Sequence, residues 1–206
     1  MQLRFACPYT GAEYVSHEGW IEASLPRCPL HPQGGCHFAR HGTDERVSPP
    51  GTRVARWYCP EGQRTFSLLP DCLAARLSGT LSEVEALVRA AEQAPSLEAL
   101  CETQRLDVEL PGALRWVRRR VRDVRDILTT IKGLLGEGFV TVAPTLTAFS
   151  AHLGVAEVLV ALRGIAAPWL AVLPSPLGFL PRRRGRETVG EARQQDAGPD
   201  PPGWPA

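Results

Sequence analysis

Two cysteine-proline corners, at Cys28 and Cys59, place the strongest constraint on what this 206-residue chain can fold into. Residues 38–47 and 52–58 are predicted to be strands, because the second alternates polar and apolar side chains and the Ser-Pro-Pro-Gly sequence at 48–51 is a strong turn signal. An antiparallel hairpin of these strands returns Cys59 to the neighbourhood of Cys28. The sequence therefore predicts a small β-hairpin with thiols at one end, where a metal ion could replace the apolar core that so few residues cannot build.

The two corners do not supply metal ligands equally. Tetrahedral zinc takes four ligands, and a zinc ribbon draws two from each corner. Cys28 and His31 form an acceptable first pair, whereas Gly62 and Gln63 stand where a second thiolate is expected after Cys59. Glutamine is a poor zinc ligand. The second corner therefore offers Cys59 alone, and the fourth ligand has to come from elsewhere.

Cys36 is the best soft donor for the fourth position, since it follows His31 closely in the chain. The alternatives are His37 and His41 nearby and Cys7 and His17 further away. The predicted ligand set is Cys28, His31, Cys36 and Cys59. Two interpretations stay open at this point. The hairpin binds zinc, or it is a degenerate ribbon held together by the aromatic side chains of Phe38, Trp57, Tyr58 and Phe66.

From Thr80 onward the hydrophobic period is that of helices. Thr80 and Glu83 match a capping box, which predicts a helix over 81–94. A short helix over 97–105 is expected next, and a proline at the first turn begins a third helix over 111–128. Three helices, two of them short and tightly joined, are typical of helix-turn-helix geometry.

The third predicted helix has two unlike faces. Its apolar residues repeat every three or four positions and form a predicted buried stripe of Leu114, Val117, Val121, Val124 and Leu128. Residues 111–126 contain six arginines and two aspartates, a net charge of +4. The candidate DNA-binding residues are Arg115, Arg118, Arg119 and Arg122, on a helix that could lie in a major groove. The alternative is a solvated face whose arginines pair with the aspartates.

We expect an α+β chain in five parts. These are an N-terminal extension (1–26), a zinc-ribbon-like hairpin (27–72), an all-α helix-turn-helix region (78–135), a helical C-terminal segment (144–180) and a disordered tail (181–206). The last segment is predicted to be disordered because a Pro- and Arg-rich composition cannot bury enough apolar surface to fold alone.

Composition narrows the class of protein. The net charge is only +1, so a surface for nucleic acid has to come from local clustering. Nearly all the positive charge is arginine, which suits phosphates and guanine edges but equally reflects a GC-rich genome. Six cysteines are too sparse for a disulfide framework, and reduced thiols in the cytoplasm are expected.

One segment, residues 153–173, is apolar enough to raise the question of a membrane span. Glu157, Arg163 and Pro168 interrupt it, so a buried helix is favoured. We therefore expect no membrane partner.

The run from Cys28 to residue 71 also carries a family resemblance. Together with the helices that follow, it resembles the N-terminal region of bacterial insertion-sequence transposases, in which a zinc ribbon precedes a helix-turn-helix. The similarity covers about residues 25–130 and rests on Cys28, Arg40-His41-Gly42, Arg56-Trp57-Tyr58-Cys59-Pro60 and Arg64-Thr65-Phe66-Ser67-Leu68-Leu69-Pro70-Asp71. The resemblance implies that Cys28, His31 and Cys59 bind zinc and that the region binds the terminal repeats of a mobile element. Gln63 departs from the family pattern.

The catalytic part of such transposases is not expected here. It needs a metal-binding acidic triad on alternating strands and helices, and only about eighty residues follow Leu128. No phosphate-binding loop or nucleophile motif is found in the sequence either. The leading hypothesis is therefore a non-enzymatic protein that binds double-stranded DNA. The alternatives are a protein-interaction module and, less favoured, a metal-dependent hydrolase, and whether the protein dimerises stays open.

Overall fold

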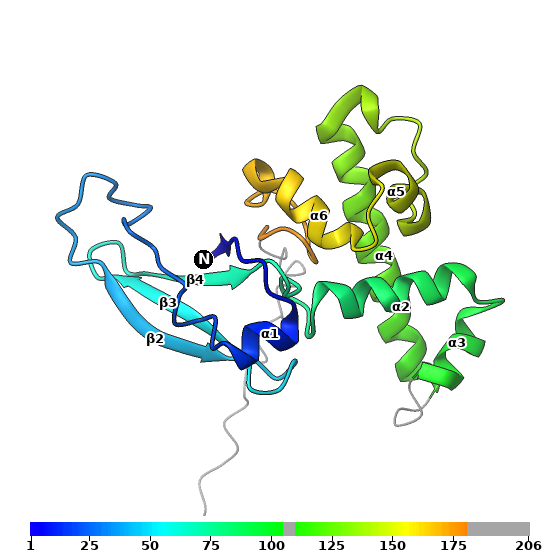
Figure 1. Cartoon of the computed structure of the whole chain (residues 1–206), viewed down its shortest axis with the longest axis horizontal. Coiled ribbons are helices and arrows are strands. Elements are labelled where there is room, and N and C mark those ends of the chain that lie inside the picture. The colour runs from blue at the N-terminus through cyan, green and yellow to red at the C-terminus, as the bar shows by residue number, and fades with distance from the viewer. Residues whose placement is uncertain (105–109, 181–206) are drawn as a thin grey trace, which may run out of the picture.

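The structure is a computed structural model that describes residues 1–104 and 110–180. It is an α+β fold in which a four-stranded mixed sheet forms one end of the molecule and a group of helices forms the other (Figure 1). The predicted disordered tail, 181–206, lies outside the described residues.

The sheet combines the predicted hairpin with two further strands. Its strands are β1 (Gln2–Phe5), β2 (Ala39–Glu45), β3 (Arg53–Cys59) and β4 (Arg64–Pro70), in the spatial order β1-β4-β3-β2. The two predicted strands are present as β2 and β3, which pair antiparallel with Ala39 opposite Tyr58. β4 pairs antiparallel with β3, and β1 pairs parallel with β4.

Residues 1–26 do not stand apart as an extension. They supply β1 and also α1 (Gly11–Ser16), whose start is held by a capping box of Thr10 and Glu13. Tyr14 is fully buried, and Trp20 is buried in the same apolar core as the sheet and the helices. The sequence alone gave no reason to assign this segment to the sheet, because a four-residue strand has too few positions to show alternation.

The helices follow the predicted pattern closely. They are α2 (Leu81–Gln93), α3 (Leu97–Gln104), α4 (Leu110–Leu135), α5 (Leu146–Leu153) and α6 (Val158–Ile165). The capping box of Thr80 and Glu83 is confirmed, since each side chain accepts a hydrogen bond from the other's backbone amide. α4 is longer than expected: the buried stripe continues to Ile131, which is fully buried, and the helix ends at Gly136 with a φ of 72°.

Two glutamates of α2 fasten the C-terminal helices to it. The buried carboxylate of Glu85 accepts hydrogen bonds from the amides of Val158 and Leu159, at the start of α6. About two helical turns further along α2, the exposed carboxylate of Glu92 accepts hydrogen bonds from the amides of Leu146 and Thr147, at the start of α5. Free amides at a helix start favour an anionic acceptor. α2 therefore orients both helices through their N-terminal ends.

A buried arginine of α6 joins the helices to the end of the sheet. The guanidinium of Arg163, which is fully buried, donates to the carbonyl oxygens of Pro70, Asp71 and Leu73, just after β4. It also donates to the carbonyl of Pro176 at 2.7 Å. Burial lowers its pKa to about 10, which still leaves it charged at neutral pH. One side chain thus ties β4, α6 and the C-terminal loop together.

The segment that raised the membrane question is part of this core. Val158, Leu159 and Leu162 of α6 are fully buried against the rest of the protein. Within the described ranges, no single helix is long and apolar enough to cross a membrane. α5 and α6 meet that description only as a pair, and they are bent by 65° relative to each other.

Candidate metal centre

The four predicted ligands lie together at the end of the sheet away from the helices. Cys59 is the last residue of β3, and the loop before β2 supplies Cys28, His31 and Cys36. Their ligand atoms, three Sγ and one imidazole nitrogen, all lie within 4.8 Å of one another. The predicted hairpin therefore does return Cys59 to the first corner. The cluster could hold a metal ion.

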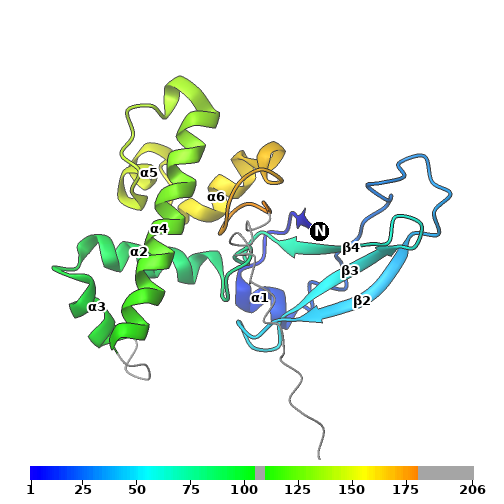
Figure 2. The same cartoon turned by 180° about the vertical axis from the view of Figure 1, so that it is seen from behind.

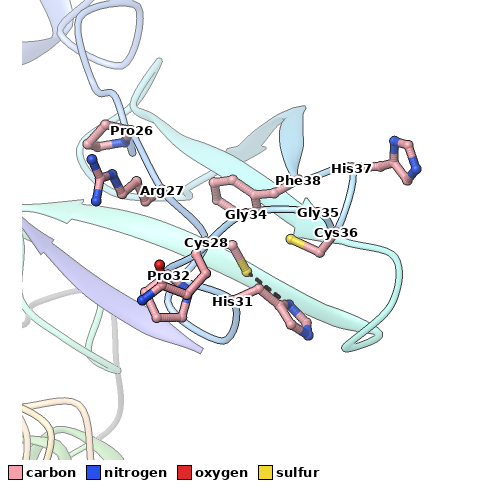
Figure 3. Close-up of a pocket in the computed structure, with 11 residues that line it drawn as sticks. Pro26, Arg27, Cys28, His31, Pro32, Gly34, Gly35, Cys36, His37 and Phe38 are labelled. Carbon is pink, nitrogen blue, oxygen red and sulfur yellow. Dashed lines mark hydrogen bonds between the residues drawn. The ribbon is translucent and has the colours of Figure 1, made fainter.

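The separations between the ligand atoms are close to those of a tetrahedral site. Nδ1 of His31 lies 3.7 Å from Sγ of Cys28 and 3.4 Å from Sγ of Cys59. Around one ion bound by a thiolate at about 2.3 Å and an imidazole at about 2.0 Å, these atoms would stand roughly 3.5 Å apart. Figure 3 shows the Cys28 sulfur and the His31 ring directed at each other from neighbouring turns of the loop.

The second corner has little room for a side chain at Gly62, where its second ligand was expected. The amide of Gly62 donates a hydrogen bond to Sγ of Cys59 at 3.3 Å. A Cβ at Gly62 would lie 2.4 Å from Cδ1 of Leu30 and 3.3 Å from Sγ of Cys59. Any side chain here would have to displace Leu30. The corner thus keeps the amide-to-sulfur bond of a metal-binding turn, while Cys36 supplies the remaining sulfur.

The other sequence candidates are directed elsewhere. His37 points away from Cys28 and His31 (Figure 3), and its backbone has a φ of 49°. His41 packs against the ring of Tyr58, with centroids 5.6 Å apart. The remoter candidates also lie away from the cluster: the His17 ring stacks on Tyr9, and Cys7 shares a small cavity with Cys72.

The thiols have unlike pKa values. Burial would raise the pKa of Cys28, but hydrogen bonds from the His31 side chain, from nearby backbone amides and from Cys59 bring it down to about 7. Burial raises the pKa of Cys36 to about 11, and the neighbouring thiols Cys28 and Cys59 add to that rise. One thiol is thus prepared to ionise at neutral pH. The crowding that opposes ionisation of Cys36 is what a bound cation would relieve.

Aromatic side chains surround the thiols rather than replacing them. The Phe38 ring stacks on Trp57 at 5.3 Å and meets Phe66 edge-on at 5.9 Å. Phe66 is fully buried and belongs to the same small cluster as three of the ligands. On the outer side, loop residues line an open cavity of about 570 Å³ beside Cys28 and Cys36 (Figure 3). The candidate ligands thus lie beside an aromatic cluster, an arrangement that both interpretations of the sequence share.

The four candidate DNA-binding arginines are far from this centre in the fold. We call Arg115, Arg118, Arg119 and Arg122 the arginine face; all four side chains are exposed on α4. Arg118 lies 3.3 Å from Glu98 of α3 and Arg122 lies 3.5 Å from Asp123, both in solvent-exposed contacts. Among the described residues, Arg115 and Arg119 make no ion pair. α4 stands at the helical end of the molecule, and the metal loop stands at the opposite end in both views (Figures 1 and 2).

One arginine of α4 behaves differently from its neighbours. Arg120 is buried, with its guanidinium 3.8 Å above the Trp116 ring and a hydrogen bond to Oγ of Ser78. The charge count for residues 111–126 did not distinguish Arg120 from the exposed arginines. The spacing of Trp116 and Arg120, four residues apart on one face, is the signal that could have separated it.

No model of a known protein family, no curated protein and no solved structure matches this chain.

Proposed function

We propose that this protein binds double-stranded DNA through the arginine face of α4, and that zinc bound at the metal centre holds the far end of the sheet in its folded form. The proposal includes no catalytic step. It also proposes that the chain is related to the end-recognition region of insertion-sequence transposases, as the sequence resemblance implies.

The observation that carries the DNA-binding proposal is the two-sided character of α4. Val117, Val124 and Leu128 are buried while the arginine face is exposed, so the helix is anchored on one side and free on the other. Arginine offers planar pairs of donors that match phosphate oxygens and guanine edges. The contact of Arg118 with Glu98 is a solvent-exposed pair, which is worth little and can be exchanged for phosphate.

Zinc is the metal that the donor set favours. Three thiolates and one imidazole are soft or borderline ligands, which select zinc over magnesium or calcium. Four protein ligands leave no open position for water, and structural zinc sites are closed in this way. The burial of the cysteines and the hydrogen bond from the Gly62 amide to Sγ of Cys59 support the same assignment. The metal would therefore serve to fold the loop rather than to perform chemistry.

The helices α2, α3 and α4 support a helix-turn-helix arrangement. α3 follows α2 after a short turn at 94–96 and packs on α4, which presents the arginine face. In such motifs the last helix lies in the major groove and the preceding helix contacts the backbone.

The proposal is tested by DNA binding at several salt concentrations. The probe is a fluorescent duplex of mixed sequence, about 30 base pairs long, and the variant is Arg115→Ala/Arg119→Ala. Each lost phosphate contact lowers the slope of log affinity against log salt by about one, so we expect a slope smaller by about 2 and affinity at least tenfold weaker at low salt. These two arginines are suitable because removing them breaks no described ion pair.

A matched control removes the same charge from the sheet. Arg53 and Arg64 are exposed on β3 and β4, so Arg53→Ala/Arg64→Ala changes the net charge equally. We expect this variant to lose less affinity than the α4 variant. Equal losses would show that only overall charge matters, and an unchanged slope in the α4 variant would remove the arginine face from the contact. Absence of binding at low salt would leave the protein-interaction hypothesis in its place.

A further inference from the structure

Two cysteines outside the metal centre are brought together where the sheet meets the helices. β1 and β4 run parallel with Phe5 opposite Pro70, and Cys7 and Cys72 each lie two residues beyond that pair. Both thiols are free, both line one cavity of about 110 Å³, and they interact closely enough for Cys72 to lower the pKa of Cys7. The fold thus brings two thiols from distant parts of the sequence to one small cavity.

Cys72 is held in a fixed position. Its carbonyl accepts a hydrogen bond of 2.7 Å from the amide of Leu81, at the start of α2. The carbonyls on either side of it, those of Asp71 and Leu73, are bound by the buried guanidinium of Arg163. Its side chain is buried. Backbone contacts on both sides therefore hold Cys72 in place beside the cavity that it shares with Cys7.

Cys7 is the more accessible and more acidic of the two. It is half-buried and lines a cavity of about 110 Å³ together with Cys72, Ser82 and Glu157. The hydrogen bond from Cys72 lowers its pKa most, burial opposes this, and the backbone amides of Asp71 and Tyr9 lower it further, to about 7. The same contact and burial raise the pKa of Cys72. An accessible, acidic thiol beside a buried one with a high pKa is the arrangement of a nucleophile and its resolving partner.

We propose that Cys7 and Cys72 form a site of reversible oxidation, with a hydroperoxide as the oxidant, in which Cys7 is the reacting thiol and Cys72 resolves it to an intramolecular disulfide.

The reaction balances without any other reactant. The Cys7 thiolate attacks one oxygen of hydrogen peroxide, the O–O bond breaks, and the departing hydroxide takes a proton to become water. Cys7 is then a sulfenic acid. The Cys72 sulfur attacks the Cys7 sulfur, the S–O bond breaks, and the hydroxide leaves with the Cys72 proton as a second water. Two thiols and one peroxide thus give one disulfide and two waters, and a cellular dithiol reverses the reaction by thiol-disulfide exchange.

The disulfide would have a defined structural effect. All four candidate metal ligands lie between residues 7 and 72 in the chain, so the bond closes a loop around the whole metal-binding segment. It also ties β1 to the segment that joins β4 to α2, between the metal end and the helices. Oxidation would therefore restrain the position of the sheet relative to α2.

The test is peptide mapping of the full-length protein, purified with zinc and exposed to graded hydrogen peroxide. Free thiols are alkylated, and the sample is digested with trypsin without reduction. Cys7 then lies in peptide 5–27 and Cys72 in peptide 65–76, whereas the candidate metal ligands lie in 28–40 and 57–64. We expect the 5–27/65–76 linkage at peroxide doses about tenfold below those that oxidise the other two peptides. Linkage among the metal-site peptides first would overturn the proposal.

Three variants separate the two roles. In Cys72→Ser the resolving thiol is gone, so Cys7 should accumulate as sulfenic acid, trapped by dimedone on peptide 5–27. In Cys7→Ser, Cys72 should stay reduced, and Cys101→Ser, which alters a buried thiol elsewhere, should form the linkage like the unaltered protein. If dimedone fails to label Cys7 in Cys72→Ser, Cys7 is not the reacting thiol. Should a variant fail to fold, the dose comparison in the unaltered protein still decides.

Discussion

The metal end of the sheet and the helical end of the molecule bury different kinds of side chain. At the metal end, three of the four buried residues in the local cluster are cysteines, and the fourth is Phe66. At the helical end, apolar residues from the sheet, α2, α4, α5 and α6 share one large core that includes Leu128, Ile131 and Phe149. The metal end has only a small apolar cluster around Phe66, so we expect its folding to depend on what the thiols bind.

This difference separates two sources of stability that usually overlap. Loss of a metal ligand should disorder one end and leave the other folded, whereas loss of a core contact should unfold the helices without first releasing the metal. The two ends are coupled chiefly through the residues just after β4, where the carbonyls of Pro70, Asp71 and Leu73 meet Arg163. Variants at each end, and at this junction, therefore test the comparison directly.

Removing a metal ligand should have the largest effect. We expect Cys59→Ser to weaken zinc binding by on the order of a thousandfold, about 4 kcal/mol, which is a quarter of the free energy that structural zinc supplies to small domains. Hydrogen exchange should accelerate at residues 28–38 and 59–66 while the amides of α4 stay protected. Elemental analysis and exchange mass spectrometry measure the two effects. Cys101→Ser is the control, since Cys101 is buried against α4 and away from the metal centre.

The outcome that contradicts the comparison is uniform exchange. If α4 lost protection together with the metal loop in Cys59→Ser, the two ends would fold as one unit and the metal would support both.

Breaking the junction should cost slightly less. Arg163→Leu removes the guanidinium donor from four carbonyl oxygens, of which those of Pro70 and Pro176 keep a backbone amide donor, and we expect the free energy of unfolding to fall by about 3 kcal/mol. Denaturant unfolding followed by circular dichroism measures this loss. Arg89→Leu is the control, because Arg89 is more exposed and shares its partner Glu85 with two amides. Retention of zinc in Arg163→Leu would show that the metal end folds without the junction.

The metal end was largely predictable from the sequence. The alternation of residues 52–58, the turn at 48–51 and the two cysteine-proline corners are local signals, and each acts within a few residues. They were enough to place Cys59 beside Cys28 and to select Cys36 as a fourth donor. The same reasoning held for the capping box at Thr80, whose geometry depends only on four consecutive residues.

The junction was not predictable, because its contacts join distant parts of the chain. β1 pairs with a strand more than sixty residues away, and nothing in Gln2–Phe5 specifies that partner. Arg163 appeared in the sequence only as a charge that interrupts an apolar helix. Its four acceptors are backbone carbonyls, which leave no trace in the side-chain pattern. Local periodicity therefore gave the elements and the site but not the contacts that connect the two ends.

Lowering the pH should weaken zinc binding at the metal centre. Each thiol that is protonated before binding lowers the apparent affinity tenfold per pH unit, since the ion displaces its proton. Burial and neighbouring thiols hold the pKa of Cys36 at about 11, so its proton opposes zinc binding over the whole neutral range. Hydrogen bonds place the pKa of Cys28 at about 7, so its proton opposes zinc binding only as the pH falls to 7 and below. From pH 8 to pH 7 we expect Cys28 and Cys36 alone to lower the zinc affinity about twentyfold, so the whole site should lose at least that much. Competition with a chromogenic chelator measures it, and an unchanged affinity would mean that the thiols bind as preformed thiolates.

The smallest effect compares two glutamates within the helical end. Glu85→Gln and Glu92→Gln are the same substitution on the same helix, and each glutamate accepts two amides at the start of another helix. Because Glu85 is buried, a glutamine there must turn its NH₂ group toward an amide donor or lose a bond, and we expect a loss of about 1.5 kcal/mol. Glu92 is exposed and water can replace the lost acceptor, so about 0.5 kcal/mol is expected. Thermal unfolding of the two variants side by side gives the difference. Equal losses would show that burial does not govern these caps, and that α5 depends on its helix-start contact as much as α6 does.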